Sequence, residues 1–422
     1  MKVKINQMRR WLILFMLLFS TLIAGARVAT AQSTSYTILP GDTWTALAMR
    51  FNVEGSELRR LNPHFNTSRQ PTIGMTITLP DDAVERSGQL VRPGNESLLS
   101  TAVRLQRSPW AIAALNGLEN PYRPNLYRPL FIPGDGTIRD FPPGVSSLEL
   151  STAAPEPGQA LGIRGMSDDP RAHLTAALDG LPVIVASAEN RFVGIVGTGA
   201  FYHGGEPELT IQVENYPAWS QPWAFAEREW DYQELTLTGE AAEIDQQARD
   251  EERVRLRELW THITPDPQWT DRFNRPITDF LSVTANYGAR RAYNGGPYLT
   301  YHEGMDFSAY AGTPVYAPAA GTVVLAERLY VRGGAVIVDH GLGIYSGYYH
   351  LSAVHVTTGQ MVQPGTILGE VGTTGLSTGN HLHWDILVNG IWVDPNAWQE
   401  QGIDCWLLEG LGKTCLPPTG TE

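Results

Sequence analysis

Histidines are concentrated in one part of this chain. Of the ten histidines in the sequence, six lie between residues 302 and 383. They include His302, which precedes Asp306 by four residues, then His350, and finally the pair His381 and His383. Imidazole and carboxylate are the ligands that zinc prefers where thiolates are absent, and three protein ligands with a water form a catalytic zinc site. The segment therefore predicts hydrolysis by metal-bound water, with histidines left over for proton transfer.

The spacing of these residues favours strands and loops over a helix. The segment His302–Asp306 reads His-Glu-x-x-Asp and invites comparison with the helical His-Glu-x-x-His motif of zinc proteases. However, Gly304 interrupts the would-be helix and the second histidine is missing, so Glu303 is not expected to act as a general base. His381 and His383 are two residues apart and would project from one face of a strand, where one can bind the metal while the other faces the bound water.

The elements that must position these residues are strands. From residue 280 to residue 398 the chain is rich in β-forming runs separated by glycine turns, and the candidate strands are 315–317, 321–325, 335–338, 346–350 and 381–386. We expect an antiparallel sheet with one face that carries the metal.

This part of the chain resembles the lysostaphin/LytM-type zinc endopeptidases, a family of peptidoglycan hydrolases. The resemblance covers roughly residues 280–400, and its most specific motifs are His-x-Gly-x-Asp at 302–306, Tyr-x-His at 348–350 and Gly-x-His-x-His at 379–383. The family commonly has Phe-Glu after the last histidine, where this chain has Trp384-Asp385. That departure touches no ligand.

The resemblance implies a role for each site residue. In the family, the first histidine, the aspartate and the last histidine bind zinc, which implies that His302, Asp306 and His383 hold one Zn²⁺. The other two, His350 and His381, correspond to the family's catalytic histidines, and either could take the proton from water or donate to the oxyanion or leaving amine. The family often has a tyrosine shortly before the first ligand, and the candidates here are Tyr298 and Tyr301. Because these ligands fill the site, His340 and His355 are expected to be bystanders.

Two segments nearer the N-terminus look like imperfect copies of a strand–helix–helix–strand unit. The first resembles the LysM domain, a small βααβ module that binds N-acetylglucosamine-containing glycans such as peptidoglycan. Its Gly-Asp-Thr opening and its Leu-Asn-Pro imply glycan contacts from Gly41, Asp42, Thr43 and Asn62. The second copy has Gly-Asn-Glu at 94–96 in place of Gly-Asp-Thr, so its glycan binding is left open.

The segments between the modules and the histidine cluster predict supporting structure. Short β-rich runs at 181–185, 192–196 and 209–213, separated by Gly, Pro and Asn turns, predict a β-sandwich-like domain with a positioning role. A charged helix over 240–260 is expected to act as a connector, with Glu251, Glu252, Arg253 and Arg255 on its solvated face. The only two cysteines, Cys405 and Cys415, lie in an apparent short loop and predict a disulfide that pins the tail.

The N-terminus and the overall charge indicate location. Basic residues at positions 2, 4, 9 and 10 precede an apolar run over 11–23 and small residues ending in Ala29-Thr30-Ala31, which predicts a secretory signal peptide cleaved before Gln32. An uncleaved membrane anchor is the alternative, although the run is shorter than the roughly 20 residues of a membrane span. A formal net charge of −13 argues against nucleic acid or an anionic membrane surface as a partner.

Together these features predict a multidomain, mainly β protein. The expected boundaries are a signal peptide at 1–31, a LysM domain at 32–82, a degenerate LysM-like unit at 83–135, a β-sandwich-like domain at 136–238, a helical linker at 239–265, a zinc peptidase domain at 266–400 and a disulfide-bearing tail at 401–422. The leading hypothesis is a secreted or cell-envelope zinc endopeptidase that cuts peptide bonds in peptidoglycan. The alternatives are a non-catalytic regulator that activates a peptidoglycan amidase and a glycan-binding structural protein, and the complete set of five site residues favours the enzyme.

Overall fold

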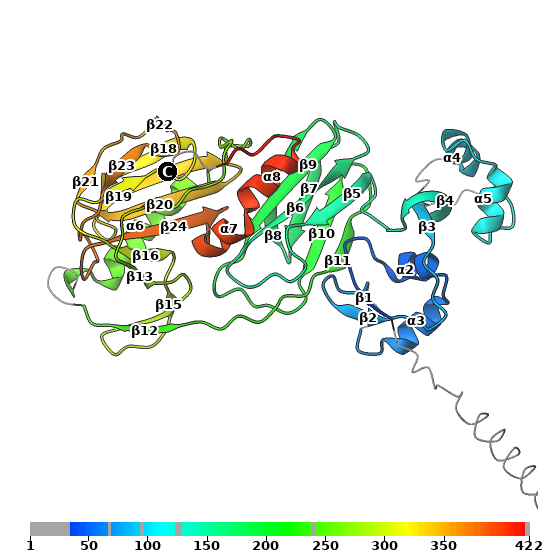
Figure 1. The fold of residues 1–422 in the computed structure, drawn as a ribbon, viewed down its shortest axis with the longest axis horizontal. Helices are drawn as coiled ribbons and strands as arrows, with labels where there is room; N and C mark the ends of the chain where they lie inside the picture. Colours follow the sequence, from blue (N-terminus) through cyan, green and yellow to red (C-terminus); the bar gives the residue numbers. More distant parts are fainter. Residues whose placement is uncertain (1–33, 66–68, 93–96, 123–128, 238–241, 418–422) are drawn as a thin grey trace, which may run out of the picture.

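The computed structural model describes residues 34–65, 69–92, 97–122, 129–237 and 242–417 (Figure 1). The predicted signal peptide and the Gly-Asn-Glu motif of the second unit therefore lie outside the described residues. Among the helices of the described part, none combines the length and the apolar character needed to cross a membrane.

Two βααβ units form one end of the molecule (Figure 1, blue to cyan). The first consists of β1 (Ser35–Thr37), α2 (Trp44–Phe51), α3 (Gly55–Leu61) and β2 (Thr76–Thr78), and the second of β3 (Ser87–Val91), α4 (Leu98–Arg104), α5 (Pro109–Leu115) and β4 (Leu130–Thr137). In each unit the two strands pair antiparallel. The predicted order of elements is confirmed in both copies.

A seven-stranded antiparallel sheet follows, built from β5 (Val145–Leu150), β6 (Ala160–Ser167), β7 (Leu174–Leu178), β8 (Leu181–Ala188), β9 (Arg191–Gly197), β10 (Glu208–Val213) and β11 (Trp219–Pro222). Strand β8 pairs with β7 through its first residues and with β9 through the rest, so it joins two halves of the sheet. Residues from both halves, such as Ile163 and Ile211, share one buried core, which gives the predicted sandwich-like packing. The three runs that predicted strands lie in β8, β9 and β10.

The first module is packed against this middle domain. Its Trp44 and Leu47 belong to the same buried core as Trp219 and Trp223 of the sheet. An isolated β-bridge joins Ile73 to Trp223. The module is therefore a structural extension of the sheet.

The C-terminal part is a second antiparallel sheet with the strand order β13-β16-β24-β20-β19-β18-β22, with β25 (Ile391–Val393) paired to β24. Its strands are β13 (Ser282–Ala285), β16 (Met305–Ser308), β18 (Gly321–Arg328), β19 (Gly334–Gly341), β20 (Ile344–Leu351), β22 (Met361–Val362) and β24 (His381–Val388). Two three-stranded sheets flank it, one formed by β17 (Pro314–Tyr316), β23 (Ile367–Glu370) and β21 (Ala353–Val354), the other by β12 (Tyr232–Leu235), β14 (Arg290–Tyr293) and β15 (Thr300–Tyr301). The five candidate strands and their antiparallel arrangement are confirmed.

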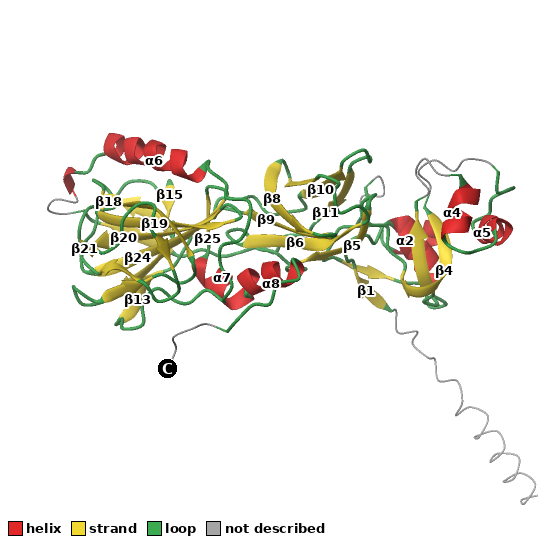
Figure 2. Cartoon of the chain, turned by 90° about the horizontal axis from the view of Figure 1, so that it is seen from above, coloured by secondary structure: helices red, strands yellow, loops and turns green. Residues whose placement is uncertain are grey.

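Every residue of β19 and β20 is buried, because both faces of these central strands are covered. Val336 and Tyr348 face the main core of the domain. Their alternating neighbours Ile337 and Tyr349 face a smaller core, to which α6 (Gln246–Trp260) contributes Leu256 and Trp260. Figure 2 shows α6 lying along one side of the strands of this domain. The helix is thus part of the domain and covers one face of its sheet, which corrects the prediction of a simple connector.

The charged residues of α6 are also less solvated than predicted. Glu252 is 7% exposed, and its carboxylate accepts hydrogen bonds from the backbone of Val331 and from Arg332. Arg253 pairs with Glu303, and Arg255 pairs with Glu327. Of the four residues assigned to a solvated face, Glu252 is wrongly assigned because tertiary packing turns it toward the sheet.

The C-terminal segment also differs from a tail with a loop. It forms α7 (Pro395–Gln401) and α8 (Ile403–Gly410), and Ile403 and Leu407 enter a core with Val193 and Ile195 of the middle domain. The predicted Cys405–Cys415 disulfide is present, but Cys405 lies in α8. In addition, β12, which precedes the expected boundary at 238, pairs in parallel with β14 of the C-terminal part. The middle domain and the C-terminal domain therefore pack against each other through a common hydrophobic core.

Candidate metal and active site

Three donor atoms converge on the surface of the C-terminal sheet. The Nε2 atom of His302 lies 3.0 Å from Oδ1 of Asp306 and 2.9 Å from Nδ1 of His383, and the latter two atoms are 2.8 Å apart. Asp306 and His383 are directly paired on neighbouring strands β16 and β24, and His302 immediately follows β15. This placement confirms that the motif runs from loop to strand.

The protonation of the cluster fits a cation. A backbone carbonyl can only accept, so Nδ1 of His302 donates to Asn286 O at 2.9 Å, and Nε2 of the neutral ring is left with a lone pair. Burial lowers the pKa of His302 and lowers that of His383 to about 3. Although burial raises the pKa of Asp306, the two neighbouring histidines outweigh it and hold that pKa well below its ordinary value. Two neutral imidazoles and a carboxylate thus turn lone pairs toward one point.

The donor set suits zinc in particular. Zinc bonds to imidazole nitrogen and carboxylate oxygen are about 2.0–2.2 Å long, so donors roughly 3 Å apart can share one ion. The carbonyl of Asn286 orients the His302 ring, as outer partners of zinc ligands commonly do. Arg291 donates a hydrogen bond to the other carboxylate oxygen of Asp306, Oδ2, at 3.1 Å. Sequence reasoning missed Arg291, since nothing in its local pattern shows that it lies beside a ligand.

The remaining two histidines stand beside the donor set. His350 and His381 have ring centroids 4.7 Å apart, and Nε2 of His381 lies 3.8 Å from Oδ1 of Asp306. Nδ1 of His350 donates to Thr374 O at 2.8 Å, and Nδ1 of His381 donates to Gly379 O at 2.8 Å. Each ring therefore keeps an Nε2 lone pair available for a proton.

The backbone at His350 is held in an unusual conformation. Its φ angle is +63°, in the left-handed region that side-chain-bearing residues rarely adopt. The amide of His350 donates to the carbonyl of Arg332 at 2.9 Å. Strain of this kind persists where the surroundings fix a residue for function. Burial and the nearby histidines lower the pKa of His350 to about 3, which keeps the ring neutral.

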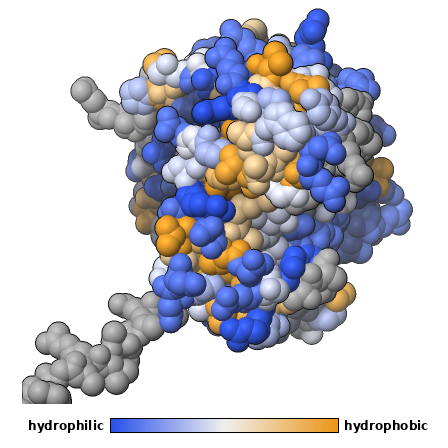
Figure 3. All heavy atoms as spheres, turned by 90° about the vertical axis from the view of Figure 1, so that its right-hand side faces the viewer, coloured by the Kyte–Doolittle hydropathy of each residue, from blue (hydrophilic) through white to orange (hydrophobic). Residues whose placement is uncertain are grey.

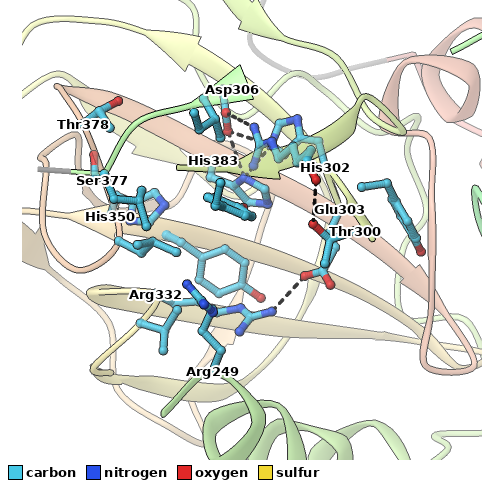
Figure 4. Close-up of a pocket in the computed structure, with 18 of the residues that line it drawn as sticks. Arg249, Thr300, His302, Glu303, Asp306, Arg332, His350, Ser377, Thr378 and His383 are labelled. Carbon is cyan, nitrogen blue, oxygen red and sulfur yellow. Dashed lines mark hydrogen bonds and ion pairs between the residues drawn. The ribbon is translucent and has the colours of Figure 1, made fainter. Parts of the chain in front are cut away.

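These residues line a cleft of ≈ 230 Å³ that also contains four arginines (Arg249, Arg253, Arg291 and Arg332). Arg332 is central to one wall, because it pairs with Glu252 of α6 and with Glu303, the neighbour of His302. Figure 4 shows the ion pair between Arg332 and Glu303 below the ligand cluster. Glu303 also pairs with Arg253. The carboxylate of Glu303 is therefore occupied, in keeping with the expectation that it is no general base.

The other residues considered from the sequence lie outside the donor cluster. Tyr301 lines the cleft but packs against Phe201 of the middle domain with ring centroids 4.9 Å apart, and Tyr298 packs against Tyr232. His340 is fully buried, donating from Nδ1 to Ala320 O and bonding through Nε2 to Ser346. A partly exposed surface pair joins His355 to Glu370. The structure places neither His340 nor His355 among the metal donors.

The four residues expected to contact glycan are buried and have partners inside the protein. Gly41 N donates to Gln221 of the middle domain, and Oδ2 of Asp42 accepts from the Tyr36 hydroxyl and the Leu39 amide. The Thr43 hydroxyl accepts from Ala46 N and caps α2, and the Asn62 amide group bonds to Leu58 and Thr78. As placed, these side chains hold the module together, and direct glycan contact from them stays a prediction.

The second unit has a different surface. Its exposed large apolar residues are Leu99, Val103, Trp110, Leu115 and Tyr122. Apolar patches among polar ones are visible on the end of the molecule where this unit lies (Figure 3). Asn116 repeats the role of Asn62, because its amide bonds to Ile112 and Phe131 in the same pattern. The repeated asparagine supports a common fold for the two units.

Two parts of the chain match known protein families. Residues 300–395 match the model of peptidase family M23, and residues 36–80 match that of the LysM domain. The peptidoglycan DD-endopeptidases ShyA and ShyC of Vibrio cholerae are 32% identical over 145 residues and 36% identical over 125 residues. These segments cover 32% and 30% of this chain, which in turn spans only 34% and 29% of the length of the two relatives.

Among solved structures, the catalytic domain of lysostaphin from Staphylococcus simulans is 32% identical, with a TM-score of 0.26. The match covers 28% of this chain and 92% of that domain. The family matches fall on the two parts whose motifs and geometry are described above. The chain therefore contains a peptidase family M23 domain and, ahead of it, a LysM domain.

Proposed function

We propose that this protein is an exported zinc endopeptidase that hydrolyses peptide bonds in bacterial peptidoglycan and acts in the cell envelope or outside the cell. The observation that carries the proposal is the cluster of His302, Asp306 and His383, whose lone pairs meet at one point beside two histidines with open Nε2 atoms. The family match and the names of the two Vibrio relatives support peptidoglycan as the substrate. Those names also favour a D,D cross-link as the bond that is cut.

In this proposal, His302, Asp306 and His383 hold the zinc ion, which when bound supplies a Lewis acid for the scissile carbonyl and acidifies a bound water. The chain's own residues handle the protons. The Nε2 atoms of His350 and His381 are positioned to take a proton from water and to return one to the leaving amine. Carbonyl oxygens of Thr374 and Gly379 fix the tautomers that make this possible.

The first LysM domain is proposed to hold the enzyme on wall glycan. Its packing against the middle domain fixes the module relative to the rest of the chain. The apolar face of the second unit is a further place where sugar rings could stack, since Trp110 and Tyr122 are both exposed and their ring centroids are 6.0 Å apart. Binding of the purified protein to insoluble peptidoglycan, compared with the Trp110→Ala variant, measures the contribution of the second unit.

The alternative of a non-catalytic amidase activator is disfavoured by the same geometry. A regulator has no need for two histidines with open nitrogens beside a complete ligand set. The test is digestion of purified cross-linked muropeptide dimers, followed by mass spectrometry of the products. The proposal predicts monomers cut within the peptide, and these products should be lost in His381→Ala. Intact dimers after incubation with the zinc-loaded wild type would contradict it.

A further inference from the structure

The cleft carries an excess of positive charge that the ligand set does not account for. Four arginines line it against two carboxylates, those of Glu303 and Asp306. The chain as a whole has a formal net charge of −13. A positive cleft in a strongly acidic protein attracts an anionic group to that place.

Three of the four arginines already have a carboxylate partner. Arg291 pairs with Asp306 at 3.1 Å, while Arg253 and Arg332 pair with Glu303 at 2.9 and 3.1 Å. Arg249 differs from them. Within the described part of the chain its guanidinium bonds only to neutral oxygens, those of the Gln246 side chain at 3.2 Å and the Ile244 carbonyl at 3.3 Å. Among the described residues of the cleft wall, its charge therefore has no counter-charge.

The position of Arg249 is defined by strand β14. The guanidinium carbon lies 5.6 Å from the centre of the Tyr293 ring, in a cation–π contact. Tyr293 and Arg291 are two residues apart on β14, so both project from the same face, about 7 Å apart along the strand. Arg291 in turn touches the ligand Asp306. In Figure 4, Arg249 extends from the helix at the lower edge toward the interior of the pocket.

We propose that Arg249, supported by Tyr293, is a subsite for a free carboxylate of the peptide substrate. A planar guanidinium can bind a carboxylate through two parallel charge-assisted hydrogen bonds. An extended peptide advances about 3.3–3.6 Å per residue, so the roughly 7 Å between Arg291 and Tyr293 along β14 corresponds to about two residues of a bound extended peptide. This inference rests on the proposed peptidase function and specifies its substrate as an acidic stem peptide.

The test compares two cross-linked muropeptide dimers that differ only in whether their stem carboxylates are free or amidated. The zinc-loaded wild type should cleave the free dimer with a kcat/KM about 10- to 100-fold higher, the range expected for charge-assisted hydrogen bonds. Arg249→Gln should reduce cleavage of the free dimer to the level of the amidated one, and Arg249→Lys should retain part of the preference. Arg257→Gln is the matched control, because Arg257 is an exposed arginine of the same helix outside the cleft.

A binding measurement separates failure of the subsite from failure of the peptidase function. Calorimetric titration of both dimers into His350→Ala, with and without Arg249→Gln, measures the binding affinity of the subsite for each dimer in the absence of cleavage. Tighter binding of the free dimer that depends on Arg249 supports the subsite. Equal binding of the two dimers, or a preference that survives Arg249→Gln, overturns it. Absence of cleavage by the wild type counts against the peptidase function alone.

Discussion

The histidine cleft and the first module both contain polar residues that the sequence singles out, yet the structure uses them in opposite ways. In the cleft, each of His302, His350 and His381 has one nitrogen fixed by a carbonyl and the other open toward the site. In the module, Asn62 is fully buried, and both its amide nitrogen and its amide oxygen bond to groups of the same module. The difference teaches that a polar residue placed for chemistry keeps one of its hydrogen-bonding atoms without a partner, whereas a residue placed for folding has partners for all of them. We call the first kind open and the second kind closed.

The comparison predicts that the largest loss of activity follows the substitution of an open residue of the cleft, such as His350. His350→Ala should reduce kcat by about 10²- to 10⁴-fold, the usual contribution of a positioned proton-transfer group. Zinc content and thermal stability should stay near those of the wild type, because His350 supplies no donor to the ligand cluster. Steady-state cleavage, metal analysis and thermal denaturation measure the three quantities. Loss of the metal together with activity would show that His350 is a ligand.

Glu252 represents a closed residue at the edge of the same cleft. Glu252→Ala should lower the free energy of unfolding by about 3–5 kcal/mol, because it removes one partner of a buried ion pair with Arg332 and leaves the buried Val331 amide without its hydrogen-bond acceptor. The control is Glu251→Ala, which changes the adjacent, exposed glutamate of the same helix. Urea denaturation compares the two variants, and equal stability would place Glu252 on the solvated face after all.

His340 is the closed counterpart of the site histidines, and its titration provides a pH test. Burial lowers its pKa from 6.5 to about 4. Between these values the unfolded chain binds a proton that the folded chain does not, so stability falls as the pH drops through this range. The loss assigned to His340 is about 3 kcal/mol at pH 4. His340→Gln should therefore show a shallower dependence of unfolding free energy on pH between 7 and 4, and an unchanged slope would contradict the assignment.

The smallest effect is expected in the first module. Asn62→Ala should destabilise this module by about 1–3 kcal/mol, because the amide and carbonyl groups it serves lose their partner. Cleavage of soluble dimers should be unaffected. Hydrogen exchange localises the loss to the module, and Asn116→Ala should have a parallel effect in the second unit. A variant that keeps its stability but no longer binds peptidoglycan would instead make Asn62 an open glycan contact.

The sequence predicted the elements well where periodicity is local. The candidate strands 346–350 and 381–386 correspond to β20 and β24, which carry His350, His381 and His383, whereas β16, which carries Asp306, is not among the strands that the sequence predicts. The pairing of β16 with β24 places Asp306 beside His383. Burial of Glu252 rather than Glu251 could not be predicted, because it depends on which face of α6 meets the sheet. Similarly, the backbone amide of Gly41 donates a hydrogen bond to Gln221, a residue 180 positions away in the chain. Such contacts between distant segments leave no local pattern.

The central claim is that His302, Asp306 and His383 together hold one zinc ion. The most direct test is the zinc content of the purified wild type and of His302→Ala, measured by calorimetric titration of zinc into the metal-free proteins and paired with cleavage of cross-linked dimers. The account predicts one tightly bound zinc and cleavage for the wild type, and for His302→Ala neither stoichiometric zinc nor detectable cleavage, with the fold retained. Wild-type zinc affinity and activity in His302→Ala would contradict it.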